Sequence, residues 1–194
     1  MILVCPLDIP KIVPNDWDEW WSTWKSADVM HKATKNHNST PLKWRGLDLY
    51  KIHDHSTNYR APYAEQNPTV VDICRQIQES FKFKITLIRV IENLETIFPH
   101  SDNITNTPSI RTFLWNTYQQ PVWTFTNDIT SYNLNIPDDT NSFYYLDGPI
   151  KHSSVYEPNY SKGVVAIYGT PTDNFENLLN TSYLKYHNYA WKIK

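Results

Sequence analysis

The apolar residues of this chain follow a helical period in three stretches. Within residues 15–35, four tryptophans share one helical face, namely Trp17, Trp20, Trp21 and Trp24. The spacing also predicts a helix over 68–81, which begins with a proline suited to a first turn, and a helix over 173–183. Aromatic stripes at helical spacing usually pack into a core. We therefore expect the tryptophan helix to pack on the body of the fold rather than to cover a substrate.

Between the second and third helices the pattern changes to short β-rich runs, separated by turns rich in Asn, Asp, Pro, Thr and Gly. The runs are residues 83–91, 109–116, 121–125, 131–136, 142–146, 152–156 and 163–168. Upstream, residues 42–45 and 47–52 read as two further short strands on either side of Gly46. Many short strands with flanking helices favour a mainly β fold of the jelly-roll type, the double-stranded β-helix shared by cupins.

The pattern contains no repeat or low-complexity linker, so we expect a single domain over residues 1–194. We divide it into an N-terminal helical and irregular region at 1–82, a jelly-roll core at 83–170, and a C-terminal helix and tail at 171–194.

Composition excludes several functional classes. The net charge of -2 and the absence of a basic run argue against a nucleic-acid or anionic-membrane partner. The chain has four glycines and no G-x-G-x-x-G or Walker loop. No apolar run reaches membrane-spanning length, and the apolar start lacks the basic region of a secretory signal. The two cysteines, Cys5 and Cys74, fit free thiols better than a disulfide, so we expect a cytoplasmic protein.

The candidate chemistry centres on His100-Ser101-Asp102, which lies between two apolar runs. On an extended backbone, side chains two residues apart point to the same face, so the imidazole and the carboxylate would face one site. They are two of the three ligands of a facial iron site. A second histidine pair, His53 and His55, has the spacing of metal ligands, but it lies in a polar stretch and reads better as two exposed side chains.

His152 is the best candidate for the third ligand. It lies fifty residues after Asp102 at the start of a late strand, and early and late strands of a jelly roll lie side by side. Lys162 follows ten residues later. If the strands at His152 and Lys162 form an antiparallel hairpin, both side chains can point into one barrel mouth, where the ammonium would pair with a ligand carboxylate.

These residues resemble the Fe(II)/2-oxoglutarate-dependent dioxygenases. The shared pattern is His100-x-Asp102, then His152, then a basic residue ten positions later. Over residues 83–170 the sequence motifs are most similar to those of the aspartyl/asparaginyl β-hydroxylase branch. Residues 99–114 resemble its P-H-x-x-x-x-N-x-R-x-R-x-H-L segment, and residues 143–155 resemble its F-D-x-S-x-x-H-x-V segment.

Three residues depart from the pattern of that branch. Asp102 stands where the branch has a glycine, so this chain offers the full set of two histidines and one carboxylate. Lys162 stands where the branch usually has arginine, which keeps the charge but loses bidentate geometry. Phe113 replaces a histidine of the branch. The chain therefore resembles the wider superfamily better than this branch.

The resemblance implies that His100, Asp102 and His152 ligate Fe(II), with no catalytic residue beyond them. It further implies that Lys162 pairs the distal carboxylate of 2-oxoglutarate, the second cofactor. The implied reaction hydroxylates a small-molecule or peptidyl substrate with O₂.

Two arginines on apolar strands add to this set of candidates. Arg89 is a further candidate for the 2-oxoglutarate contact, and Arg111, with Trp115, for the substrate contact. For both arginines an outward face with a surface partner is the alternative. Aromatic candidates for the pocket wall, with ordinary core as the alternative, are Tyr144, Trp115, Trp123 and Tyr168.

Two other functions fit the same residues. In a cupin-type metal enzyme that does not use 2-oxoglutarate, Lys162 would be a surface residue. In a non-catalytic jelly-roll binding module, the histidines and the aspartate would be satisfied polar groups.

Overall fold

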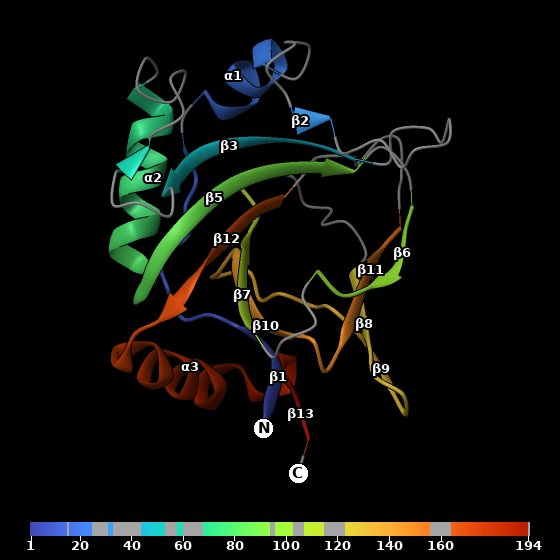
Figure 1. Cartoon of the computed structure of the whole chain (residues 1–194). Coiled ribbons are helices and arrows are strands. Elements are labelled where there is room, and N and C mark those ends of the chain that lie inside the picture. The colour runs from blue at the N-terminus through green and yellow to red at the C-terminus, as the bar shows by residue number, and fades with distance from the viewer. Residues whose placement is uncertain are drawn as a thin grey trace.

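Two antiparallel β-sheets form the body of the protein (Figure 1). The structure is a computed structural model that describes residues 1–14, 16–24, 31–32, 44–52, 58–59, 68–93, 96–102, 107–114, 123–155 and 164–193. In strand order, the larger sheet contains β13 (Trp191–Lys192), β1 (Ile2–Pro6), β10 (Ser142–Asp147), β7 (Thr107–Thr112), β12 (Val164–Pro171), β5 (Phe83–Asn93), β3 (Trp44–Ile52) and β2 (His31–Lys32), with β4 (Asn58–Tyr59) paired to β3. The smaller sheet contains β6 (Ile97–His100), β11 (Lys151–Ser154), β8 (Trp123–Thr126) and β9 (Ser131–Asn133).

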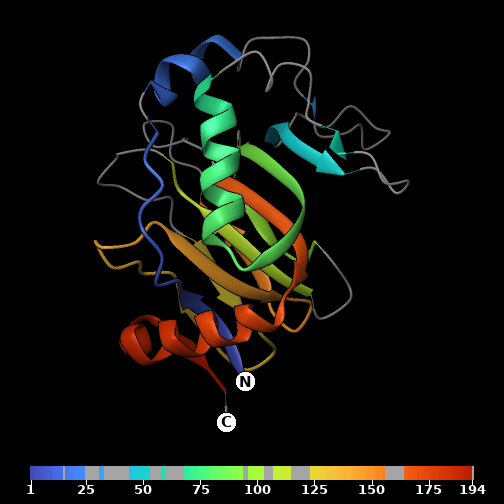
Figure 2. The same cartoon turned by 90° about the vertical axis from the view of Figure 1, so that its left-hand side faces the viewer.

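Helices cover the outer side of the larger sheet. They are α1 (Trp17–Trp24), α2 (Pro68–Ser80) and α3 (Asp173–Tyr186), which continues into the short 3-10 helix η1 (His187–Tyr189). Figure 2 shows α2 in front of this sheet, with α3 below it and α1 above it. The buried face of α2 presents Val70, Ile73, Cys74 and Ile77, and the Cys74 thiol is directed at the Leu49 carbonyl of β3. None of the helices that the structure describes has the length and apolar character needed to cross a bilayer.

The expectation of a mainly β fold with a few helices is confirmed, because all described strand pairs are antiparallel and three α-helices accompany them. The packing of the tryptophan helix is also confirmed, since Trp17, Trp20 and Trp21 are buried. The structure describes this helix from Trp17 to Trp24, and His31 pairs with Gly46 in a strand.

The expected hairpin between the strands at His152 and Lys162 is wrong. β11 pairs with β6 and β8 in the smaller sheet, whereas β12 pairs with β5 and β7 in the larger one. Burial explains the separation. The first four residues of β12 are all buried, as in a central strand covered on both faces, while β11 alternates exposed and buried side chains. The strands expected at 42–45 and 47–52 are a single strand, β3, with an irregularity after Asp48.

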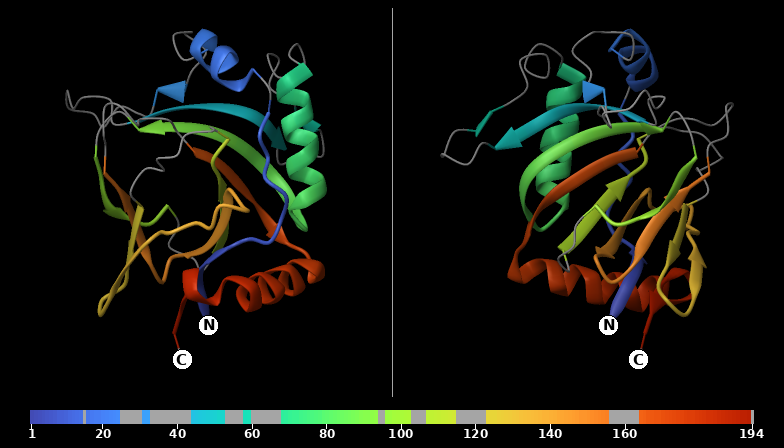
Figure 3. Two further views of the ribbon diagram at one scale, coloured as in Figure 1. Left: turned by 180° about the vertical axis from the view of Figure 1, so that it is seen from behind. Right: turned by 45° about the vertical axis from the view of Figure 1, so that its right-hand side comes forward.

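The two sheets face each other (Figure 3). Phe125 of the smaller sheet contacts Phe143 and Tyr145 of the larger one. One register row of the larger sheet carries two arginines, since Asp48, Arg89, Ala166, Arg111 and Phe143 follow one another across five strands. This row places charged residues beside the inner face of the smaller sheet.

Candidate metal centre

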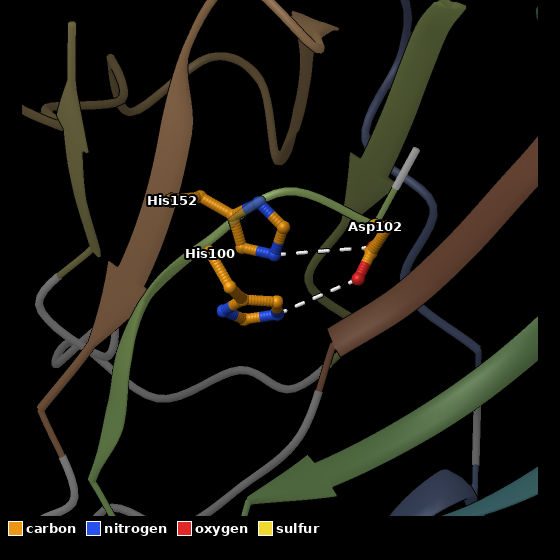
Figure 4. Close-up of side chains that lie close together, drawn as sticks. All are labelled: His100, Asp102 and His152. Atoms are coloured by element: carbon orange, nitrogen blue, oxygen red, sulfur yellow. Dashed lines mark ion pairs between the residues drawn. The ribbon is translucent and has the colours of Figure 1, made fainter. Parts of the chain in front are cut away.

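Two histidines face each other on adjacent strands of the smaller sheet. His100 ends β6, His152 lies on β11, and the antiparallel register pairs them directly. Directly opposed residues of an antiparallel pair project to the same face. Their ring centroids accordingly lie 4.4 Å apart, and both rings turn toward Asp102 (Figure 4).

Asp102 completes a triad whose ligand atoms lie within 4.8 Å of one another. Its Oδ1 lies 3.4 Å from His100 Nε2, and its Oδ2 lies 3.9 Å from His152 Nε2. We expected an extended strand to place His100 and Asp102 on one face, and this expectation is wrong. β6 ends at His100, and Asp102 lies in a bend beyond it, so the chain turns the carboxylate back toward the imidazole. A bend permits this approach, whereas a continuing strand would carry Asp102 away from His152.

His100 presents its Nε2 to the site. Its Nδ1 lies 2.8 Å from the Phe98 carbonyl oxygen, to which it donates, so the neutral ring keeps the lone pair on Nε2. Hydrogen bonding to Asp102 is the largest influence on this ring and raises the pKa of His100, against the opposing effect of burial. A backbone carbonyl that fixes the tautomer is a common support of a metal-binding histidine.

His152 is buried against aromatic rings. It stacks on Trp123 with ring centroids 5.5 Å apart and planes at 10°, and it also contacts Tyr145. Burial, assisted by the positive charges of Arg111 and His100, lowers the pKa of His152 to about 3, although Asp102 opposes the shift. The imidazole is therefore neutral near pH 7, the form that ligates a metal. Among the described residues its buried Nδ1 has no hydrogen-bond partner.

Asp102 is held as a carboxylate. Burial raises its pKa, but the hydrogen bond from His100 and the charges of Arg111 and both histidines outweigh burial, so the pKa lies well below its usual range. Arg111 Nη2 donates to Asp102 Oδ2 over 3.1 Å. The triad therefore offers the neutral Nε2 of His152, an anionic oxygen of Asp102, and the Nε2 of His100 once that ring has released its proton to an incoming metal.

Arg111 faces inward, which decides between the two orientations that the sequence left open. The side chain is 1% exposed. Besides Asp102, it donates to the Ile110 carbonyl and to the hydroxyls of Tyr145 and Tyr168. These contacts use the guanidinium inside the protein and favour a role toward Asp102 over the substrate contact that we expected.

Arg89 is paired with Asp48. Its Nε and Nη2 donate to the two carboxylate oxygens of Asp48, the second over 3.2 Å. Burial lowers the pKa of Arg89, but this hydrogen-bonded pairing outweighs burial and raises it. The Arg89 side chain is 24% exposed, and its Nη1 makes no hydrogen bond with another residue that the structure describes. The Nε–Nη2 edge of the guanidinium is thus bound to Asp48, and Nη1 remains available to donate to a ligand.

Sequence reasoning missed two residues that support the ligand turn. Ser101, between the two ligands, donates from Oγ to Asp147 Oδ1 over 2.6 Å. Asp147 ends β10, is fully buried, and also accepts from the Gly148 backbone N–H. The Asp147-Gly148 pair is a turn signal, and Gly148 has a φ of 110°, but no pattern along the chain connects this turn to Ser101.

The other candidates divide into three groups. Lys162, Trp115, His53 and His55 lie outside the described residues. Trp123 and Tyr168 belong to the site, through His152 and Arg111 respectively. Tyr144 projects from the opposite face of β10 and contacts Phe175 of α3, which makes it a core residue there.

The donor set fits a divalent first-row metal. Bonds of roughly 2.1 Å at right angles separate two ligand atoms by about 3 Å, and the three ligand atoms lie within 4.8 Å of one another, so side-chain adjustments of about 1–2 Å would close the set around an ion. Two histidines and one carboxylate are the ligands of non-haem Fe(II) oxygenases, which keep the remaining positions open. The neutral His152 and the ionised Asp102 need no proton release before they bind such an ion.

No protein-family model matches this chain. A comparison with curated proteins also gives no match. Among solved structures, the chain is similar to a crystal structure described as an oxidoreductase of the 2OG-Fe(II) oxygenase family from Burkholderia pseudomallei. The similarity covers 67% of this chain and 70% of that chain, with 9% sequence identity and a TM-score of 0.41.

Proposed function

We propose that this protein is a non-haem Fe(II)- and 2-oxoglutarate-dependent dioxygenase that hydroxylates a small-molecule or peptidyl substrate. One observation carries the proposal. Two opposed histidines and one ionised aspartate converge from β6, β11 and the bend after β6, with ligand atoms within 4.8 Å. A carboxylate and two neutral imidazoles on one side of an ion leave the other side open for a cosubstrate and O₂.

The protein's own residues would perform three tasks. His100, Asp102 and His152 hold the ion, and Phe98 and Trp123 fix the orientation of the two rings. The bound iron and 2-oxoglutarate supply the activation of O₂ that hydroxylation of a C–H bond requires. Overall, 2-oxoglutarate, O₂ and R–H give succinate, CO₂ and R–OH, so one oxygen atom enters each organic product.

We assign the distal carboxylate of 2-oxoglutarate to Lys162, the residue that matches the sequence pattern, with Arg89 as a second contact. What supports Arg89 is its position on the inner face of the larger sheet and its available Nη1 edge. A guanidinium that donates side-on to one carboxylate can donate end-on to a second carboxylate. Trp115, one residue beyond the described segment that follows Arg111, remains our candidate for a substrate contact.

Anaerobic addition of Fe(II) and then 2-oxoglutarate tests the proposal. The wild-type protein should develop a visible charge-transfer band from the chelated cosubstrate and should form succinate when O₂ is admitted. His152→Ala should lose the band. A folded wild-type protein that shows no band, or a band that survives in the His152→Ala protein, contradicts the proposal.

A further inference from the structure

We propose that Arg111 is a positioning residue that restricts Asp102 to binding the metal through a single oxygen, and so keeps a third coordination position open. The inference rests on the proposed iron centre and assigns a role that the ligand pattern does not contain. It replaces the substrate contact that the sequence suggested for Arg111.

The two oxygens of Asp102 have different neighbours. Oδ2 accepts the hydrogen bond from Arg111 Nη2 over 3.1 Å and lies 3.9 Å from His152 Nε2, whereas Oδ1 faces His100 Nε2 at 3.4 Å. A charge-assisted hydrogen bond from a guanidinium is among the stronger contacts that a carboxylate makes. Oδ2 is therefore engaged on the protein side, and Oδ1 is the oxygen left for an ion beside His100.

Arg111 is fixed by its surroundings. It lies on β7 between β10 and β12, and its side chain is 1% exposed. The Tyr145 and Tyr168 hydroxyls accept from the same Nη2 over 2.7 and 3.2 Å, and the guanidinium carbon lies 5.1 and 4.9 Å from their ring centroids. Nη1 donates to the Ile110 carbonyl over 3.1 Å. A cation held by this many contacts cannot follow Asp102 if the carboxylate rotates.

The number of coordinating oxygens decides what else the ion can bind. An octahedral ion held by two histidines and one carboxylate oxygen keeps three positions, and a second carboxylate oxygen removes one of them. A chelating 2-oxo acid occupies two positions, so O₂ needs the third. Without Arg111, Asp102 is free to bind through both oxygens and close that position.

Arg111→Met tests this role with nitric oxide as the probe of the third position. Each protein is loaded with Fe(II) anaerobically, saturated with 2-oxoglutarate and exposed to nitric oxide, and the iron–nitrosyl signal is measured by electron paramagnetic resonance. The wild type should give the full signal. Arg111→Met should bind Fe(II) and 2-oxoglutarate but lose the nitrosyl signal at least tenfold. A folded Arg111→Met protein with the full signal overturns the inference.

Tyr144→Phe is the matched control, because Tyr144 lies on the opposite face of β10, where it contacts Phe175 of α3. It should keep the nitrosyl signal, and loss of the signal in both variants would overturn the specific role of Arg111. A structural role alone would lower stability in both variants without changing the coordination.

A second measurement does not depend on any variant folding. A crystal structure of the Fe(II)-loaded wild type should show one Asp102 oxygen at a bonding distance of roughly 2.1 Å and the other on Arg111. Two bonded oxygens would overturn the inference and leave the proposed function intact. A wild type that binds no Fe(II) would overturn the proposed function itself.

Discussion

His100 and His152 occupy opposed positions on two antiparallel strands, and their ring centroids lie 4.4 Å apart. The backbone ladder alone fixes this relationship, because a cross-strand pair projects to one face at short range. The strand pairing itself therefore brings the two imidazole rings together. Metal affinity should accordingly depend on the identity of these side chains more than on any rearrangement.

His152→Ala should lower the affinity for Fe(II) at least tenfold, since changes even to residues that only support a ligand typically reduce metal affinity 10- to 100-fold. Titration with Fe(II) under anaerobic conditions measures the effect. His187→Ala is the control, because His187 is exposed on η1, away from the triad. Equal affinities of the two variants would remove His152 from the ligand set.

The metal-free protein should lose stability as the pH falls from 6 to 4. The folded state lowers the pKa of His152 to about 3, while the unfolded chain protonates it near 6.5. Unfolding then takes up a proton in this window, so stability is fully present above 6.5 and declines by up to about 1.4 kcal/mol per pH unit. The raised pKa of His100 acts in the opposite direction, but mainly above pH 6.

Urea unfolding in the presence of a chelator at pH 6, 5 and 4 measures this slope. His152→Leu, which cannot titrate, should flatten the slope by about one proton relative to the wild type. Asp102 adds its own acid sensitivity only below its ordinary pKa near 3.8. Parallel slopes for the two proteins would show that His152 does not control the acid response.

Ser101→Ala should lower the free energy of unfolding by about 1–3 kcal/mol, because it removes a hydrogen bond to the buried Asp147 carboxylate. It should also weaken Fe(II) binding, since Ser101 lies between two ligands. Ser153→Ala is the control, as its hydroxyl, next to His152, donates to the Thr124 backbone carbonyl. If both variants bind Fe(II) with wild-type affinity, Ser101 does not support the ligand turn.

Arg89→Lys should weaken 2-oxoglutarate binding about tenfold and leave Fe(II) affinity unchanged. Lysine keeps a positive charge beside Asp48 but loses the second guanidinium edge. The charge-transfer band measures the titration with 2-oxoglutarate and the titration with Fe(II). The probe 2-oxopentanoate, which lacks the distal carboxylate, should bind both proteins equally. A parallel loss for both 2-oxo acids would show that Arg89 does not contact that carboxylate.

Gly169→Ala should destabilise the fold by at least about 2 kcal/mol. Gly169 lies at the irregularity between β12 and β5, and a Cβ there would come within 2.2 Å of the Lys84 carbonyl oxygen and 2.9 Å of the Ile85 Cα. Both neighbours are backbone atoms, so the strands must move apart. Thr170→Ala, at the next and exposed position, should change stability by less than about 0.5 kcal/mol. Similar unfolding midpoints for the two variants would contradict the clash.

The sequence predicted what depends on local pattern. Helix α2 and most strands of residues 83–171 follow from periodicity, and the grouping of His100, Asp102 and His152 came from motif spacing. The sheet to which each strand belongs was not predictable. β11 and β12 are neighbours in sequence, yet burial on both faces takes β12 into the larger sheet.

The support of the ligands was also not predictable from the sequence. The Arg111–Asp102 and Ser101–Asp147 contacts join residues 9 and 46 positions apart, and no periodicity links either pair. The inward position of Tyr145 was not predictable from the sequence for a related reason. Adjacent tyrosines on a strand face opposite sides, and only the register with Ser109 and Val4 shows that Tyr145 is the inner one.

The place of β6 in the smaller sheet has a consequence for cooperativity. Within the part of the chain that the structure describes, β6 pairs only with β11, and their register is interrupted between His152 and Ser154. An ion held by His100 and His152 would tie these same two strands together a second time. Metal loading should then slow hydrogen exchange of the β6 amides most, because an edge strand opens more readily than the central strands. Metal binding through His100 and His152 would thus stabilise the edge strand β6. Loss of the ion would then remove both the metal site and the local order of this strand.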